Sequence, residues 1–132
     1  MGVGTATLTK TESRTMNKLA IDWTSSSSGA VPSTDSETIS GEILRCVFVP
    51  DSSGTQPSNA YDVTLSDADG IDILAGNGAN LSNTTALSIV PGEELLSGGS
   101  SGIRPFAVDG PLSLVVANAG DTKGGTINLY YR

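Results

Sequence analysis

The sequence predicts an all-β fold: a single-domain antiparallel β-sandwich (jelly-roll-like) or a barrel of about eight short strands. Three observations support this prediction. Short segments of alternating apolar and polar residues recur along the chain, and clusters of Gly, Pro, Asn, Asp and Ser separate them. Glycine is abundant, at 16 residues, as are β-branched residues. No segment keeps a helical period beyond a turn or two.

The length of 132 residues fits one domain, and an apolar fraction of 37% is enough for one hydrophobic core. Residues 1–18 alternate weakly and then become polar, so we interpret them as an extended N-terminal arm or an edge strand. Residues 19–132 contain the remaining strand patterns. We therefore assign them to the β-sandwich domain.

The clearest strand lies at residues 61–66, where Tyr61, Val63 and Leu65 alternate with polar residues. An Asp-Gly turn at 67–70 and a short apolar run at 71–74 follow it. Two apolar segments around such a turn are typical of a β-hairpin. A loop rich in Gly and Asn then covers residues 75–83.

Further strands are predicted from the same alternation, and two polar segments, 25–36 and 51–59, are predicted to be loops. Residues 42–49 are apolar on both faces, which favours a central strand covered on both sides or by a second subunit. The last two strands are expected to form a closing hairpin, with one of the two final tyrosines facing inward. The remaining strands are expected at residues 4–10, 19–24, 83–90, 104–108, 112–117 and 126–132.

The net charge of −7 argues against nucleic acid as a partner, because an acidic surface repels the phosphate backbone. No apolar run reaches the length of a membrane span, so we expect no membrane partner. The first residues also lack the apolar core of a signal peptide. These features predict a soluble protein made in the cytoplasm.

The residue inventory leaves few routes to catalysis. The chain has no histidine and one cysteine, which removes the usual nucleophilic triads and the common zinc sites. Paired carboxylates of a glycosidase could be drawn from 14 acidic residues, but aromatic residues are scarce. Cys46 lies in an apolar run, so we expect a buried, inert thiol. We predict a protein that is not an enzyme.

The only candidate cofactor is calcium. Asp67, Asp69 and Asp72 form the pattern D-x-D-G-x-D, and calcium prefers carboxylate oxygens held by a tight loop that contains glycine. The pattern lacks the distal glutamate and the flanking helices of an EF-hand. The alternative is a hairpin turn in which the aspartates bind their own backbone. We favour the turn and expect no other cofactor.

Candidate partner contacts come from two places. Lys10, Arg14 and Lys18 form a loose basic group that would suit an acidic partner, or that is an ordinary solvated surface. Near the end of the chain, Tyr130 is a candidate for an outward-facing aromatic contact.

Two stretches carry a resemblance to a known class of proteins. The stretch VTLSDADGIDILAGNGANLS resembles small structural proteins of tailed bacteriophages, in which a strand precedes D-x-D-G-x-D-x-L and a Gly/Ala/Asn-rich segment. The end of the chain, GPLSLVVANAGDTKGGTINLYYR, resembles their closing hairpin. Together the two stretches cover roughly a third of the chain.

The resemblance implies a role in the virion and supplies no catalytic residue. It implies a capsid cement or decoration protein that binds the major capsid protein at the capsid surface, after synthesis in the host cytoplasm. Such proteins are often homotrimers, and the arm at 1–18 would then reach a neighbouring subunit. Two alternatives remain open. One is a head–tail connector, tail or fibre-associated protein, and the other is a calcium-dependent carbohydrate-binding module.

Overall fold

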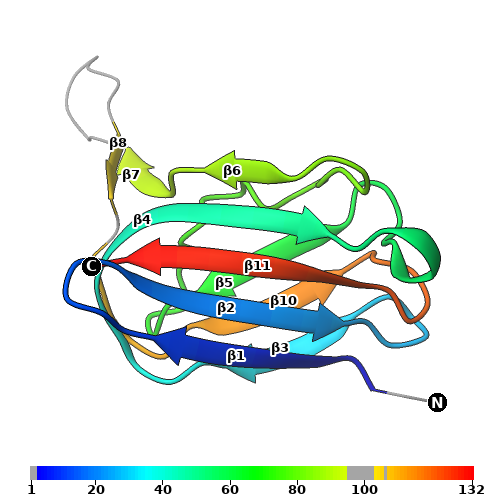
Figure 1. Cartoon of the computed structure of the whole chain (residues 1–132), viewed down its shortest axis with the longest axis horizontal. Coiled ribbons are helices and arrows are strands. Elements are labelled where there is room, and N and C mark those ends of the chain that lie inside the picture. Colours follow the sequence, from blue (N-terminus) through cyan, green and yellow to red (C-terminus); the bar gives the residue numbers. More distant parts are fainter. Residues whose placement is uncertain (1–2, 95–102, 106) are drawn as a thin grey trace.

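The structure is a computed structural model that describes residues 3–94, 103–105 and 107–132. Two antiparallel β-sheets pack face to face, and the larger sheet lies in front of the smaller one in Figure 1. The sheets form an open sandwich and do not close into a barrel. Its elements are β1 (Thr5–Thr11), β2 (Asn17–Thr24), β3 (Val31–Asp35), β4 (Ile39–Pro50), the 3₁₀ turn η1 (Ser53–Thr55), β5 (Asp62–Ser66), β6 (Leu87–Ile89), β7 (Gly92–Glu94), β8 (Ile103–Pro105), β9 (Ala107–Gly110), β10 (Ser113–Ala117) and β11 (Gly124–Tyr131).

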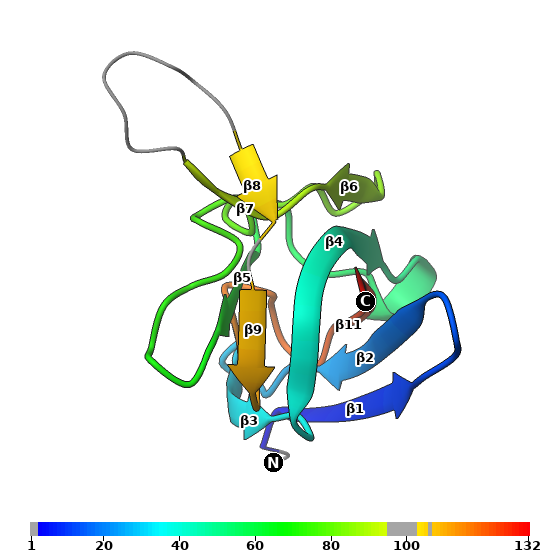
Figure 2. The same ribbon diagram turned by 90° about the vertical axis from the view of Figure 1, so that its left-hand side faces the viewer.

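The order of strands shows how the chain alternates between the two sheets. The larger sheet has the order β1-β2-β11-β4-β6, and β9 pairs with the beginning of β4. The smaller sheet has the order β3-β10-β5, and β7 pairs with β8 apart from both. Figure 2 shows β4 curving as it passes from its pairing with β9 toward the rest of the larger sheet.

Strict alternation positions β2 and β11, as their sequences predict. Leu19, Ile21 and Trp23 point into the sandwich from β2, while their neighbours stay half-buried or exposed. On β11, Ile127 lies opposite Ile21, and Leu129 lies opposite Leu19, so the inward residues form matched rows. Burial of such rows between two sheets is the main stabilising contribution to a sandwich.

Of the two predictions for residues 42–49 of β4, a strand covered on both sides within the chain is wrong, whereas coverage by a second subunit stays a prediction. The strand is buried on one face only, because Val47 is half-buried and Val49 is 38% exposed on the other face. The inward residues are Ile43 and then Cys46, three positions apart. A register shift opposite β11 inserts Leu44 as an extra residue, which reverses the alternation at that point.

The predicted closing hairpin does not form. The strands β10 and β11 belong to different sheets: β10 pairs with β3 and β5, whereas β11 pairs with β2 and β4. The turn between them therefore crosses from one sheet to the other, and Asn118 adopts a positive φ of 61° in it. Both strands carry inward apolar residues, so each can fill the core from its own side.

The segment at 25–36 is also more ordered than its sequence predicts. Its second half is β3, an edge strand that contains Pro32 and pairs with β10. Proline is acceptable in an edge strand because that strand has an unpaired side. Val31 is fully buried, and it anchors this otherwise polar strand to the core.

An aromatic pair links the two halves of the core. The rings of Trp23 on β2 and Tyr61, next to β5, have centroids 5.5 Å apart and are tilted by 41°. This is within the range of favourable aromatic packing. Tyr131 is buried and Tyr130 points outward, which confirms the expected division between the two tyrosines.

The N-terminal segment is part of the larger sheet. β1 pairs with β2 along its whole length, from Thr5 opposite Thr24 to Thr11 opposite Lys18. In the sheet order, β1 is the outermost strand. Of the two interpretations of residues 1–18, the structure therefore has the edge strand at Thr5–Thr11.

Candidate functional site

The turn at 67–70 is built around the carboxylate of Asp67. Its Oδ1 accepts hydrogen bonds from the backbone N–H of Asp69 at 2.9 Å and of Ile71 at 3.0 Å. The backbone closes the same turn, because the N–H of Gly70 donates to the carbonyl of Asp67, and Gly70 has a φ of 81°. These bonds are typical of an Asx turn, which is the structural alternative to a calcium loop.

Asp72 binds a second set of backbone amides. Its Oδ1 accepts from the N–H groups of Leu65 and Leu74, and its Oδ2 accepts from the N–H of Gly76. The carboxylate thus binds backbone N–H groups that would bond to a neighbouring strand if residues 71–74 continued as a strand. Only an isolated bridge joins Ser66 to Asp72, so the second strand of the predicted hairpin is absent at 71–74.

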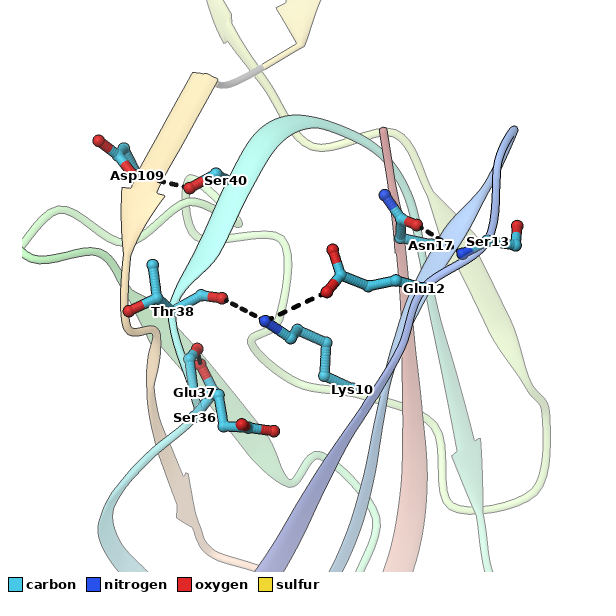
Figure 3. A network of polar contacts seen from close by, with 9 residues as sticks. All are labelled: Lys10, Glu12, Ser13, Asn17, Ser36, Glu37, Thr38, Ser40 and Asp109. Atoms are coloured by element: carbon cyan, nitrogen blue, oxygen red, sulfur yellow. Dashed lines mark hydrogen bonds and ion pairs between the residues drawn. The ribbon is translucent and has the colours of Figure 1, made fainter.

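The three aspartates of the calcium pattern do not converge on one point. The described residues contain no group of three acidic, cysteine or histidine side chains arranged to hold a metal ion. Asp67 and Asp69 line a cleft of about 290 Å³ together with Asp109 of β9, while Asp72 lies outside its lining. Asp109 accepts a hydrogen bond from Ser40 at 2.7 Å (Figure 3). Calcium binding stays the alternative to the favoured turn.

Two of the four predicted partner contacts lie near the β1–β2 connection. The ammonium of Lys10 donates to the carbonyl of Thr38 at 3.0 Å and pairs with Glu12 at 3.4 Å, as Figure 3 shows. Lys10 is opposite the core residue Leu19, so it points toward the side of the sheet that carries the core. Arg14 is exposed in the connection itself.

The other two, Lys18 and Tyr130, lie side by side on the outer face of the larger sheet. They are directly opposite each other on β2 and β11. On its other side Tyr130 is opposite Arg45 of β4, whose guanidinium carbon lies 5.7 Å from the centre of the tyrosine ring. The structure therefore groups Lys18 and Tyr130 with Arg45, and it places Lys10 on the opposite face.

Arg45 was missed among the candidate contacts, although the sequence contains a signal for it. It is the only charged residue within the apolar run 43–49. A charged residue in such a strand is expected to face the solvent, beside the outward residues of its neighbours. The pairing partner cannot be read from this pattern, because it depends on which strand lies next to β4.

The buried ionisable groups are held in their neutral forms. Burial raises the pKa of the Cys46 thiol to about 12, so at neutral pH the reactive thiolate is absent. Burial, with a smaller contribution from the charge of Asp51, raises the pKa of Tyr61 to about 12. The pKa of Tyr131 is also raised, by burial first and then by Glu12 and Glu37. These groups lie in the core.

Two further observations concern the membrane and the comparisons with known proteins. Within the described residues, no helix has the length and hydropathy that crossing a membrane requires. No family model, no curated protein and no solved structure matches the chain.

Proposed function

We propose that this protein is a non-enzymatic virion structural protein, a cement or decoration protein that binds the major capsid protein of a tailed bacteriophage and stabilises its head. The proposal rests on the resemblance of residues 63–82 and 110–132 to phage structural proteins, together with one structural feature. That feature is the open edge of β1.

The edge of β1 is suited to joining subunits. Thr5–Thr11 has seven residues, contains no proline and, among the described residues, is hydrogen-bonded to a strand on the β2 side alone, although it also contacts β3 of the smaller sheet. Proteins usually shorten or block such edges, because their unpaired N–H and C=O groups bind other strands. At the opposite side of the sheet, β6 has only three residues. The contrast supports a role for β1 in pairing with a strand of the capsid protein or of a second copy.

The same feature suits a homo-oligomer, for which we propose a trimer at a symmetry axis of the capsid. Strand addition supplies backbone hydrogen bonds without a deep pocket, and neighbouring side chains then supply specificity. In β1 the outward threonines alternate with half-buried residues, so the strand presents one polar and one partly apolar side. The proposed location of the protein is the surface of the virion.

The edge can be tested with lysine substitutions, which block strand addition while the side chains remain in solvent. Particles that lack the protein are mixed with the wild type or with the Thr7→Lys/Thr9→Lys variant, and the bound copies are counted by quantitative mass spectrometry. We expect the wild type to bind at high copy number, and the variant to bind roughly tenfold more weakly, equivalent to about 1.4 kcal/mol. The matched control is Thr24→Lys, an exposed position one strand inward.

Copy number separates the virion alternatives. Copies on the order of hundreds per particle support decoration, whereas a single ring of copies supports a connector or tail protein. The remaining alternative, a calcium-dependent carbohydrate-binding module, would use the cleft lined by Asp67, Asp69 and Asp109, although the described residues contain no group of three acidic side chains arranged to hold a metal ion. An unchanged melting temperature in excess calcium would exclude that alternative, because a ligand that binds only the native state must raise it.

A further inference from the structure

A short line of side chains crosses the outer face of the larger sheet, and we call it the cation–aromatic row: Lys18, Tyr130 and Arg45. The three residues lie directly opposite one another on adjacent strands β2, β11 and β4. Since neighbouring strands are about 4.8 Å apart, the backbones of Lys18 and Arg45 are roughly 10 Å apart, with the tyrosine ring between them.

Arg45 is held in position within the row by two contacts. The Nε of Arg45 donates to the Oγ of Ser88 on β6 at 2.8 Å. Its guanidinium carbon lies 5.7 Å from the centre of the Tyr130 ring, which is a cation–π distance. A guanidinium fixed in this way loses less conformational entropy on binding a carboxylate than a free side chain would.

The charges of the row are available to a partner. In the described part of the chain, neither Lys18 nor Arg45 has a carboxylate within ion-pair distance. The ion pair found there joins Lys10 and Glu12, on the other face of the sheet. On one side the next row is neutral, with Ala20, Asn128 and Val47 opposite one another. On the other side, Arg132 lies opposite Glu42.

The charge of the whole molecule narrows the kind of partner. A chain with a net charge of −7 repels a densely charged polyanion, so two cations are too few to hold nucleic acid. A protein segment with two spaced carboxylates and an apolar group between them matches both the charge and the spacing of the row. Arginine and tyrosine are also enriched at the centres of protein interfaces.

We propose that the cation–aromatic row is a docking surface for an acidic segment of a partner protein. One carboxylate of the segment pairs with Arg45, a second pairs with Lys18, and an apolar side chain packs on Tyr130. This inference goes beyond the virion proposal, because it assigns a different surface from the edge of β1 and holds whichever acidic protein is the partner.

The test uses a short, fluorescently labelled peptide in which glutamates flank a central phenylalanine, and a matched peptide with glutamine in place of glutamate. We expect the full chain to bind the acidic peptide and not the neutral one, with an affinity that falls as salt rises. The Lys18→Gln/Arg45→Gln variant is expected to bind roughly tenfold more weakly. Lys123→Gln, which neutralises a cation outside the row, is the control and should leave binding unchanged.

A charge-reversed variant makes the test decisive. Lys18→Glu/Arg45→Glu should lose the acidic peptide and gain a matched lysine peptide, while thermal melting verifies that each variant is folded. Failure of the wild type to bind the acidic peptide would overturn the proposal. So would equal loss of binding in the Lys123→Gln control, or equal affinity of the wild type for the two peptides.

Discussion

At the scale of single residues, close packing around Trp23 leaves no room for a side chain at the position opposite it. Gly125 of β11 is paired with Trp23, and a Cβ atom built on it would lie 2.9 Å from the indole ring. Trp23 is itself 1% exposed, so the ring is enclosed by the core. The glycine is therefore required by the tryptophan, and not by a turn.

We expect Gly125→Ala to lower the free energy of unfolding by about 2 kcal/mol, because overpacking a filled core forces side chains or backbone to shift. Urea denaturation of the variant measures the loss. Gly54→Ala is a matched control, since a Cβ atom at Gly54 meets nothing within 4 Å. Equal stability of the two variants would show that the indole ring has room to move.

The aspartates of the 67–72 segment divide into structural and free ones. Asp72 accepts three backbone hydrogen bonds, from Leu65, Leu74 and Gly76. Asp69 is exposed. Among the described residues, its backbone N–H donates a hydrogen bond to the carboxylate of Asp67. Asp69 and Asp72 are close in sequence, so they form a natural pair for comparison.

Replacing Asp72 by alanine should destabilise the protein by roughly 2 kcal/mol, because three amide donors lose their acceptor in a partly buried loop. Asp69→Ala should change stability by less than about 0.5 kcal/mol, as expected for an exposed side chain. Thermal melting of both variants in calcium-free buffer makes the comparison. A large loss in Asp69→Ala together with none in Asp72→Ala would contradict this assignment.

At the scale of elements, the sequence predicts which residues face inward better than it predicts which strands are neighbours. The alternation in β2 and β11 is enough to predict their inward residues, because a half-buried strand must place every second side chain in the core. The same alternation exists in β10, yet it does not reveal that β10 belongs to the other sheet. Which strands pair with each other depends on the path of the connecting turns, and the alternation within one strand does not reveal this path.

The errors in the predicted elements have local physical causes. The predicted hairpin at 61–74 fails because the carboxylate of Asp72 binds amides that a second strand would have used. The polar composition of β3, which includes Pro32, predicts a loop, although the buried Val31 anchors the strand to the core. The two-sided burial predicted for β4 is absent because the smaller sheet covers one face of the larger sheet, so Val47 and Val49 on the other face stay half-buried or exposed.

The candidate contacts show the same limit. Charge and position along the chain identified Lys18 and Tyr130, but they also grouped Lys10 and Arg14 with Lys18. In the structure, Lys10 turns to Thr38 and Glu12 on the other face. Arg45 joins the row from β4, which is far away in sequence. A surface composed across three strands becomes visible only when the order of the strands is known.

At the scale of the whole molecule, the two sheets enclose a thiol whose burial disfavours the ionised form. Cys46 on β4 is fully buried and lies opposite Leu129 of β11, near the middle of the larger sheet. Burial raises the pKa of this thiol from 9.0 to about 12. Tyr61, on the side of the smaller sheet, has its pKa raised from 10.0 to about 12.

These raised pKa values predict a loss of stability at alkaline pH. Above pH 9 the unfolded chain releases the Cys46 proton while the native chain retains it, so the unfolded state binds fewer protons and the free energy of unfolding falls as pH rises. Tyr61 adds a loss of the same sign above its unfolded pKa of 10.0. The contribution is fully present below pH 9 and is lost toward pH 12.

Urea denaturation of the reduced protein at a series of pH values should therefore show a decrease of roughly 4 kcal/mol by about pH 11, with the larger share from the thiol. The Cys46→Ala variant should be less stable at pH 7, because it creates a cavity, but its stability should fall less steeply above pH 9. Tyr61 accounts for the remaining slope. Parallel pH profiles for the wild type and the variant would mean that the thiol ionises in the native sandwich, and hence that water reaches the space between the sheets.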